Sequence, residues 1–277
     1  MTPFKTLLDE LQGGIELALP VEIEELYGGP LAFLSPRDPD LPRVIACWVE
    51  SADGIISYSD IPGSEGGNLI AGGYENDRFL VALLRTVADA RLFGRGTLHM
   101  ERDGTGTPQD IYPEGAELLD AARSSLGKPK ETTSVLVTLQ AEIPLSANIF
   151  HASDVRNIIY TIESSVGKLL NIQKHENTTV KAFAPSEFER KVLVDLKREY
   201  GINLLLIEGG PTVWGSFMRY IDEFFITLSP RLVGNTRAVA RPTPIQGVLF
   251  DPKTSPKLAL SSVKQSDDFL FLRYIQK

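Results

Sequence analysis

Short apolar runs alternate with amphipathic segments along most of the chain, and this alternation predicts an α/β fold. Between the runs, apolar residues recur at helical spacing, as at Phe79, Leu83 and Val87. Because strands that alternate with helices pair in parallel, we expect a mixed, mainly parallel central sheet. The expected strands are 44–49, 88–93, 134–139, 155–161, 180–183, 204–207 and 223–229, and the expected helices are 76–87, 117–126, 185–200 and 213–220.

The two ends of the chain depart from this pattern. Residues 1–42 are expected to form an N-terminal extension with short helices over 6–11 and 19–27, and residues 43–277 to form the main domain. Whether the extension covers the main domain or a partner subunit is open. At the other end, the apolar runs 258–263 and 269–275 predict a closing antiparallel hairpin. The segments 59–73 and 104–115 are rich in turn residues and are expected to be loops.

One strand-to-helix turn carries candidate chemistry. The strand 204–207 ends at Glu208, and Gly209, Gly210 and Pro211 lead into the next helix. Glycines let backbone N–H groups approach a ligand closely, and a helix N-terminus favours negative charge. A phosphate-bearing cofactor fits this arrangement, although an ordinary strand–helix turn explains the motif equally well.

A second turn of the same kind lies upstream, where Gly94-Arg95-Gly96-Thr97 follows the strand 88–93. The Arg95 guanidinium could bind a phosphate, such as the 2′-phosphate that distinguishes NADP from NAD. Two familiar fingerprints are absent. The dinucleotide motif fails because position 99 is His, and the P-loop motif fails because Ser216 stands where lysine is required.

Four segments in order extend this interpretation: Ser51-Ala52-Asp53-Gly54, then 84–90 with 94–97, then 208–212, then 229–234. Together they resemble the bacterial riboflavin-biosynthesis pyrimidine reductases, the RibD C-terminal domain family. The resemblance implies a three-layer, dihydrofolate reductase-like fold with NADPH as cofactor. It implies hydride transfer to a small polar, pyrimidine- or pterin-like substrate, as in a 5-amino-6-(5-phosphoribosylamino)uracil reductase.

The resemblance also assigns roles to single residues. Asp53 and Glu208 become candidate catalytic carboxylates, and both of them together with Arg85 become candidate substrate-binding residues. Simpler alternatives stay open: an Asp-Gly turn for Asp53, a carboxylate that holds its own turn for Glu208, and a solvated charge for Arg85. The expected cofactor-binding residues are Gly94, Arg95, Gly96, Thr97, Glu101, Thr138, Gly209, Gly210, Pro211, Thr212, Val213 and Gly215.

The chain departs from the family pattern after Thr97. The family has an acidic segment followed by Thr-Val-Arg, and that arginine contributes to the substrate's phosphate site. Here the segment reads Glu101-Arg102-Asp103-Gly104-Thr105, in which Glu101 could replace the first acidic residue, and no Thr-Val-Arg follows. A changed substrate is therefore an alternative, such as an unrelated small carbonyl compound. A non-catalytic nucleotide-binding homodimer is the alternative from another class.

Composition limits the kinds of partner and bound group that are expected. The net charge is −8 and no basic run stands out, so nucleic acid is not expected as a partner. Cys47 is the only cysteine, which excludes an intramolecular disulfide. His99, His151 and His175 are scattered without metal-ligand spacing, so no metal site is expected. No targeting signal and no apolar run of about 20 residues is found, which favours the cytoplasm and no membrane contact.

A homodimer is expected from the family resemblance and from the strand 224–228. Phe224 and Ile226 point to one face of this strand, and Phe225 points to the other. Both faces carry apolar area and need cover. A helix of the same chain can cover one face, and a second subunit or the N-terminal extension can cover the other.

Overall fold

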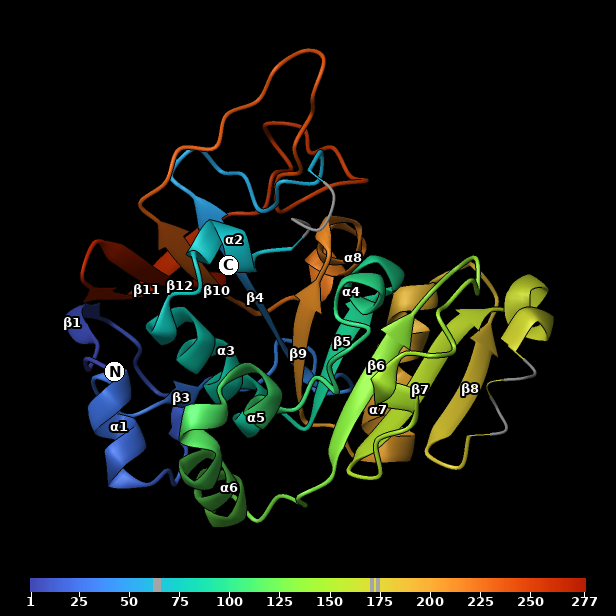
Figure 1. Cartoon of the computed structure of the whole chain (residues 1–277), viewed down its shortest axis with the longest axis horizontal. Helices are drawn as coiled ribbons and strands as arrows, with labels where there is room; N and C mark the ends of the chain where they lie inside the picture. Colours follow the sequence, from blue (N-terminus) through green and yellow to red (C-terminus); the bar gives the residue numbers. More distant parts are fainter. Residues whose placement is uncertain (62–65, 170–171, 173–174) are drawn as a thin grey trace.

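The computed structural model describes residues 1–61, 66–169, 172 and 175–277. In this part of the chain a ten-stranded sheet runs along the whole molecule in the order β1-β11-β12-β10-β4-β9-β5-β6-β7-β8 (Figure 1). Neighbouring strands from β10 to β8 pair in parallel, whereas β12, β11 and β1 continue the sheet in antiparallel fashion. The expected mixed, mainly parallel sheet with a C-terminal antiparallel hairpin is confirmed.

The strands of the large sheet are β1 Lys5–Asp9, β4 Arg43–Ser51, β5 Ala90–Gly94, β6 Thr132–Val137, β7 Val155–Ile162, β8 Thr178–Phe183, β9 Leu204–Gly209, β10 Glu223–Ser229, β11 Leu258–Ser266 and β12 Phe269–Gln276. A small second sheet pairs β2 Ile15–Glu16 with β3 Ala32–Phe33. The helices are α1 Val21–Tyr27, α2 Asn68–Ala71, α3 Glu75–Val87, α4 Arg95–Met100, α5 Pro108–Ile111, α6 Ala116–Ser125, α7 Phe188–Tyr200 and α8 Pro211–Phe217.

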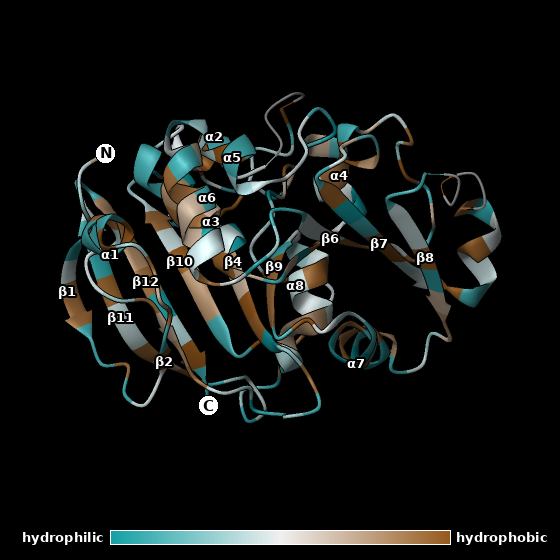
Figure 2. Cartoon of the chain, turned by 90° about the horizontal axis from the view of Figure 1, so that it is seen from below, coloured by the Kyte–Doolittle hydropathy of each residue, from teal (hydrophilic) through white to brown (hydrophobic). Residues whose placement is uncertain are grey.

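Helices cover both faces of the sheet, which makes three layers. Helices α1, α3 and α6 pack on one face, and α7 and α8 pack on the other (Figure 2). Strand β9 shows why its sequence is a continuous apolar run. Leu204 and Leu206 face the α3 layer, while Leu205 and Ile207 face the α7 layer, so every residue of the run is buried.

The N-terminal extension belongs to the same sheet. Its first strand, β1, pairs with β11, so the helix expected over 6–11 is wrong: backbone pairing with the sheet edge overrides the local pattern there. The helix expected over 19–27 is confirmed as α1, with Pro20 immediately before it. The domain boundary at residue 42 stays a prediction.

Both faces of β10 are covered within the chain. The Phe33 ring of the extension lies 6.2 Å from the Phe225 ring on one face. On the other face, the Phe224 ring lies 5.8 Å from the Trp48 ring. The extension therefore covers the main domain on the Phe225 side, and the apolar strand by itself no longer requires a second subunit.

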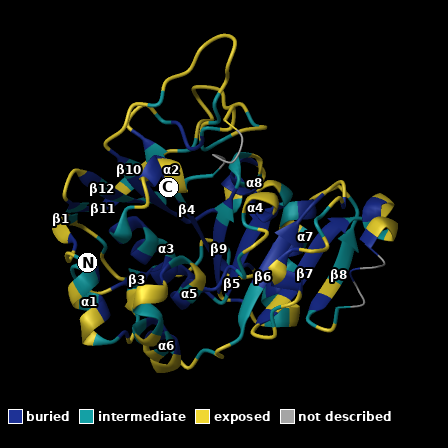
Figure 3. Cartoon of the chain, viewed as in Figure 1, coloured by how far each residue is buried: buried dark blue, intermediate teal, exposed yellow. Residues whose placement is uncertain are grey.

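The segments expected to be loops contain short helices. Helix α2 lies within 59–73 and α5 within 104–115, while residues 62–65 are outside the described residues. The long connection between β10 and β11 is irregular and mostly exposed, and it projects beyond the sheet (Figure 3). No helix in the described ranges is long and apolar enough to cross a membrane.

Candidate active site

The order of the strands in the sheet reverses between β4 and β9. Strand β9 lies between β4 and β5, although it follows β8 in the chain. Its pairing with β4 runs only from Arg43↔Leu204 to Ala46↔Ile207, so the two strands separate beyond those residues. Open α/β sheets bind ligands at the carboxyl edge where the strand order reverses. A ligand-binding site is therefore expected at the carboxyl edge of the sheet, between β4 and β9.

The two glycine turns predicted separately from the sequence lie beside each other at this edge. Because β5 pairs with β9, the turn into α4 and the turn into α8 are adjacent. A Cβ added to Gly94 would come within 2.8 Å of Val213 in α8, and one added to Gly210 would come within 3.9 Å of Thr97 in α4. Two helix N-termini therefore meet at one position.

Backbone donors at these two N-termini are left without side-chain caps. Neither Gly94 before α4 nor Gly210 before α8 provides a capping side chain. The first N–H groups of a helix have no partner within the helix and readily bind an anion. A Cβ added to the exposed Gly96 would meet nothing within 4 Å, so the space beside this turn is open to a ligand. The phosphates of a nucleotide fit this arrangement.

Some of the predicted cofactor-binding glycines are also required by packing. Gly209 has φ +80°, and a Cβ there would overlap the Trp214 ring. Trp214 in turn donates a hydrogen bond from Nε1 to the carbonyl of Ile207, at 3.1 Å, and Ile207 is the last β9 residue that pairs with β4. A Cβ on Gly215 would overlap the Gln246 backbone. These contacts are sufficient to explain both glycines without a ligand.

Glu208 is held by two arginines. Arg85 of α3 donates to both carboxylate oxygens, from Nε at 2.6 Å and from Nη2 at 2.8 Å. Arg91 of β5 donates from Nη1 at 3.0 Å. Strand alternation puts Glu208 on the α3 side, with Leu204 and Leu206, and a register shift between β5 and β9 leaves it opposite no β5 residue. The sequence suggested that Glu208 contacts substrate or holds its own turn, and neither hypothesis included this pair of arginines.

Charge pairing controls the ionisation of this cluster. Burial by itself would raise the pKa of Glu208, but the charges of Arg85 and Arg91 outweigh burial and hold this pKa below its ordinary value. Burial likewise would lower the pKa of Arg85, and Glu208 and Glu101 together raise it. The Glu101 carboxylate is half-exposed and accepts from Arg91 Nη1 at 3.1 Å. Arg85 therefore stays charged and Glu208 stays a carboxylate.

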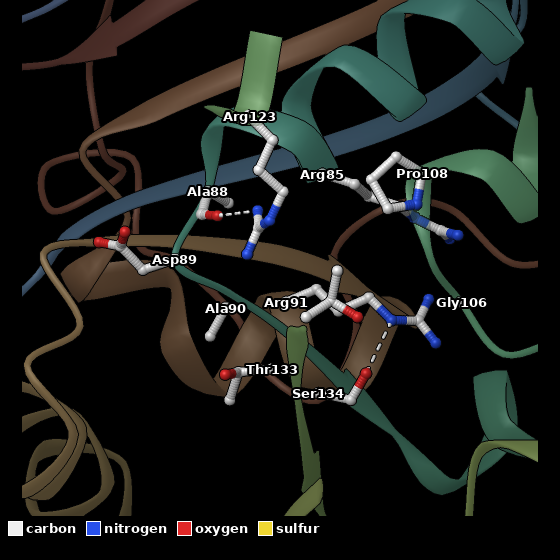
Figure 4. Close-up of a pocket in the computed structure, with 11 residues that line it drawn as sticks. Arg85, Ala88, Asp89, Ala90, Arg91, Gly106, Pro108, Arg123, Thr133 and Ser134 are labelled. Carbon is white, nitrogen blue, oxygen red and sulfur yellow. Dashed lines mark hydrogen bonds between the residues drawn. The ribbon is translucent and has the colours of Figure 1, made fainter. Parts of the chain in front are cut away.

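Arg91 lines a small cavity between α3, α6 and the start of β5 and β6 (Figure 4). Its Nε donates to Ser134 Oγ at 3.3 Å. Gly106, with φ +74°, closes directly over its guanidinium, where a Cβ would overlap it. Arg123 lines the same cavity, but it donates to backbone carbonyls such as that of Thr86, at 3.0 Å. Arg91 thus has a fixed orientation before any ligand binds.

Asp53 connects two loops at the same edge. Its Oδ1 accepts from Ser51 Oγ at 2.6 Å and from the Val233 N–H at 3.0 Å, and its Oδ2 accepts from the Gly234 N–H at 2.7 Å. These hydrogen bonds, with that from Ser51 contributing most, lower the pKa of Asp53 to about 2. At neutral pH the side chain is a hydrogen-bond acceptor and not a proton donor. Its role as a catalytic and substrate-binding residue stays a prediction.

The remaining predicted residues lie around the two turns. Thr97 is buried in α4, and the half-exposed Arg95 forms an ion pair with Glu142 at 3.2 Å. Thr138 follows β6, and its hydroxyl accepts from the Ala141 N–H at 3.1 Å. Pro211 and Thr212 open α8. Their contacts with a cofactor stay predictions.

Sequence reasoning missed Arg91, which donates to Glu208. An arginine inside an expected buried strand is a signal, because an unpaired buried charge is costly and indicates an acidic partner nearby. No group of three or more potential metal ligands lies together within 1–61, 66–169, 172 and 175–277.

The geometry defines a class of protein: an α/β sheet that opens at a strand-order reversal beside two uncapped helix N-termini, as in nucleotide-binding enzymes. The chain belongs to the RibD C-terminal domain family, whose model matches residues 42–270. No curated protein sequence matches it.

Solved structures similar to this chain share its fold. RibD of Acinetobacter baumannii is 20% identical with a TM-score of 0.63, over 86% of this chain and 58% of that protein. A pyrimidine reductase-like protein of Corynebacterium diphtheriae is 19% identical with a TM-score of 0.64, over 94% of this chain and 96% of that protein. The riboflavin biosynthesis reductase Rib7 of Saccharomyces cerevisiae is 13% identical with a TM-score of 0.58, over 87% and 92%. The chain thus spans just over half the length of the A. baumannii protein. The expected dihydrofolate reductase-like fold is confirmed.

Proposed function

We propose that the protein is an NADPH-dependent reductase of the riboflavin-biosynthesis type. Family membership supports an oxidoreductase. The observation that carries the proposal is the meeting of two uncapped helix N-termini beside the point where β4 and β9 separate. Bound there, the dihydronicotinamide would supply the hydride, and the chain would supply binding, orientation and electrostatics.

Each part of the site has a distinct task in this proposal. The turns 94–97 and 209–213 bind the phosphates through backbone N–H groups. Asp53 ties the loop after β4 to the loop after β10, which fixes the edge that the substrate enters. The cluster of Glu208, Arg85 and Arg91 forms a rigid charged wall on the α3 side.

We propose a small polar heterocycle as substrate, of the pyrimidine or pterin type. The rigid wall presents both acceptors and guanidinium donors, which match the edge of such a ring. The test is oxidation of NADPH, followed by its absorbance, with 5-amino-6-(5-phosphoribosylamino)uracil, dihydrofolate and a simple aldehyde. Turnover with the aldehyde alone would support the unrelated-carbonyl alternative. Tight NADPH binding without turnover on any of the three would support a non-catalytic nucleotide-binding protein.

We expect Arg95→Ala to remove a preference for NADPH over NADH. A charge-assisted hydrogen bond to the 2′-phosphate contributes about 1.5–3 kcal/mol, or roughly 10- to 150-fold in affinity. Because Arg95 pairs with Glu142, Glu142→Gln should leave NADPH binding equal or tighter. Titration of both nucleotides against the three proteins is the measurement. Equal NADPH affinity in wild type and Arg95→Ala would exclude Arg95 from the site.

We further propose a homodimer. This proposal rests on the family resemblance alone, because the N-terminal extension already covers the Phe225 face of β10. The expected result is a mass of about twice 30.5 kDa by light scattering after size exclusion at micromolar concentration. A stable symmetric interface would bury on the order of 1,600 Å². A mass near 30.5 kDa would mean a monomer.

A further inference from the structure

A carboxylate of the chain itself lies on the solvent side of the charged wall. Glu101 directly follows α4, and its side chain is 38% exposed, whereas Arg85 and Arg91 are buried. Glu101 Oε2 lies 3.1 Å from Arg91 Nη1 and 3.7 Å from Arg85 Nη2. The same two nitrogens donate to the buried Glu208 Oε2, at 3.0 Å and 2.8 Å. Glu101 therefore stands where an anionic group of a ligand would meet the two guanidinium groups.

The other donors of the two arginines are also engaged within the chain. Arg91 Nε donates to Ser134 Oγ at 3.3 Å. Gly106 covers Arg91 Nη2, since a Cβ added to this glycine would lie 1.9 Å from that nitrogen. Arg85 uses its Nε and Nη2 in the two hydrogen bonds to Glu208. A guanidinium binds a phosphate best through two parallel N–H groups, and in both arginines these pairs are already taken up.

A third carboxylate lies next to this cluster. Asp110 Oδ2 accepts from the N–H groups of Thr105 and Gly106, at 2.9 Å and 3.0 Å, so it is bonded to the residue that covers Arg91. Burial would lower the pKa of Arg85, and Asp110 adds to the charges that raise it. With Glu101 and Glu208, three carboxylates surround two guanidinium groups, which makes the cluster negative.

The segment that borders the wall adds acidic residues and no basic ones. Between Arg102 and Arg123 the sequence contains several Asp and Glu residues but neither Lys nor Arg. A phosphate monoester carries a charge of about −1.5 to −2 at neutral pH. A negative, largely buried cluster repels such a group, because charges in this environment are screened less than in water. An uncharged heterocycle meets no such repulsion, and its N–H groups can donate to the carboxylates.

We propose that the site prefers a heterocyclic substrate without a phosphate group, and that Glu101 sets this preference. This inference rests on the proposed function and names the substrate class of the same site. Glu101 occupies Arg91 Nη1 and contributes negative charge, so a phosphate has to displace this carboxylate before it can reach either arginine. A phosphorylated heterocycle is therefore a poorer substrate than its unphosphorylated form, and not an inert one.

The test uses a matched pair of ligands: 5-amino-6-(5-phosphoribosylamino)uracil and the same compound after removal of its phosphate. Calorimetric titration of each compound into the protein, in the presence of NADP⁺, measures binding without turnover. We expect the wild type to bind the unphosphorylated compound at least tenfold more tightly. Glu101→Gln frees Arg91 Nη1 and removes one negative charge. Its affinity for the phosphorylated compound should rise roughly 10- to 150-fold, so the preference should disappear or reverse.

Asp103→Asn is the matched control. Asp103 lies two residues after Glu101, but its side chain is 93% exposed and pairs with Arg102 at 3.7 Å. This variant loses the same charge and should keep the wild-type preference, as should Glu101→Asp, which retains the carboxylate. Thermal melts check that each variant folds. Equal or tighter binding of the phosphorylated compound by the wild type would overturn the inference. A preference that Glu101→Gln leaves within twofold of wild type would do the same.

Turnover separates this inference from the proposed function. If NADPH is oxidised, kcat/KM should be at least tenfold higher with the unphosphorylated compound, and the reverse order would overturn the inference. If NADPH is oxidised with neither compound, the proposed function fails, while the binding preference and its loss in Glu101→Gln still judge the role of Glu101. Binding of neither compound would overturn the inference as well.

Discussion

Glu208→Ala should lower the free energy of unfolding by about 3–5 kcal/mol. The Glu208 side chain is 8% exposed, and its two arginine partners are 5% and 6% exposed. Removing the carboxylate leaves Arg85 and Arg91 buried with only the half-exposed Glu101 as an acidic partner. Two nearly uncompensated guanidinium groups are costly away from water, so the site and the fold should weaken together.

Urea denaturation at neutral pH measures this effect. Glu142→Ala is the control, because Glu142 is largely exposed and its ion pair with Arg95 is a surface one. Surface pairs contribute about 0–1 kcal/mol. A Glu208→Ala protein as stable as the control, but inactive, would show that Glu208 serves the substrate and not the fold.

Stability in acid provides a further check on Glu208. Its pKa is lowered in the folded protein, so its stabilising contribution is present at neutral pH and is lost as the pH falls through the folded value, below about 4.5. The raised pKa of Asp77 has the opposite sign: between about pH 4 and pH 6, its ionisation lowers the free energy of unfolding. Glu208→Gln should therefore flatten the loss of stability in acid, and Asp77→Asn should be more stable than wild type above pH 6.

Gly96→Val should weaken NADPH binding roughly 10- to 150-fold while leaving stability unchanged. Gly96 lies in the first turn of α4, with open space where a side chain would project. A valine there would fill the space next to the helix N-terminus and separate the phosphate from the backbone N–H groups. Loss of one charge-assisted hydrogen bond corresponds to about 1.5–3 kcal/mol.

Gly167→Val is the matched control, since a Cβ at Gly167 also meets nothing within 4 Å and this residue is in the segment Glu163–Leu169 after β7. Calorimetric titration with NADPH and thermal melts of both variants are the measurements. Gly209→Val is not a clean alternative, because its side chain would overlap Trp214. Normal NADPH affinity in Gly96→Val would remove the turn 94–97 from the cofactor site.

Local patterns in the sequence determined the elements of the fold. The apolar run 204–207 is buried on both faces, and the amphipathic pattern around Phe79 and Leu83 forms α3. Apolar periodicity is a local property, and burial of those same side chains drives the fold, so pattern and structure agree. The two glycine turns could also be predicted, because glycine reports a backbone requirement that is local.

Only the tertiary structure decided how the charges combine. Glu208 lies 123 residues after Arg85 and 117 residues after Arg91, and it meets them because β9 inserts between β4 and β5. The same insertion brings the turn into α4 against the turn into α8. Whether a carboxylate holds a proton depends on its burial and on its neighbours, which a linear pattern does not contain. Asp53 and Glu208 could therefore be named from the sequence, but only the fold decided that both are ionised, through the hydrogen bonds to Asp53 and the two arginines at Glu208.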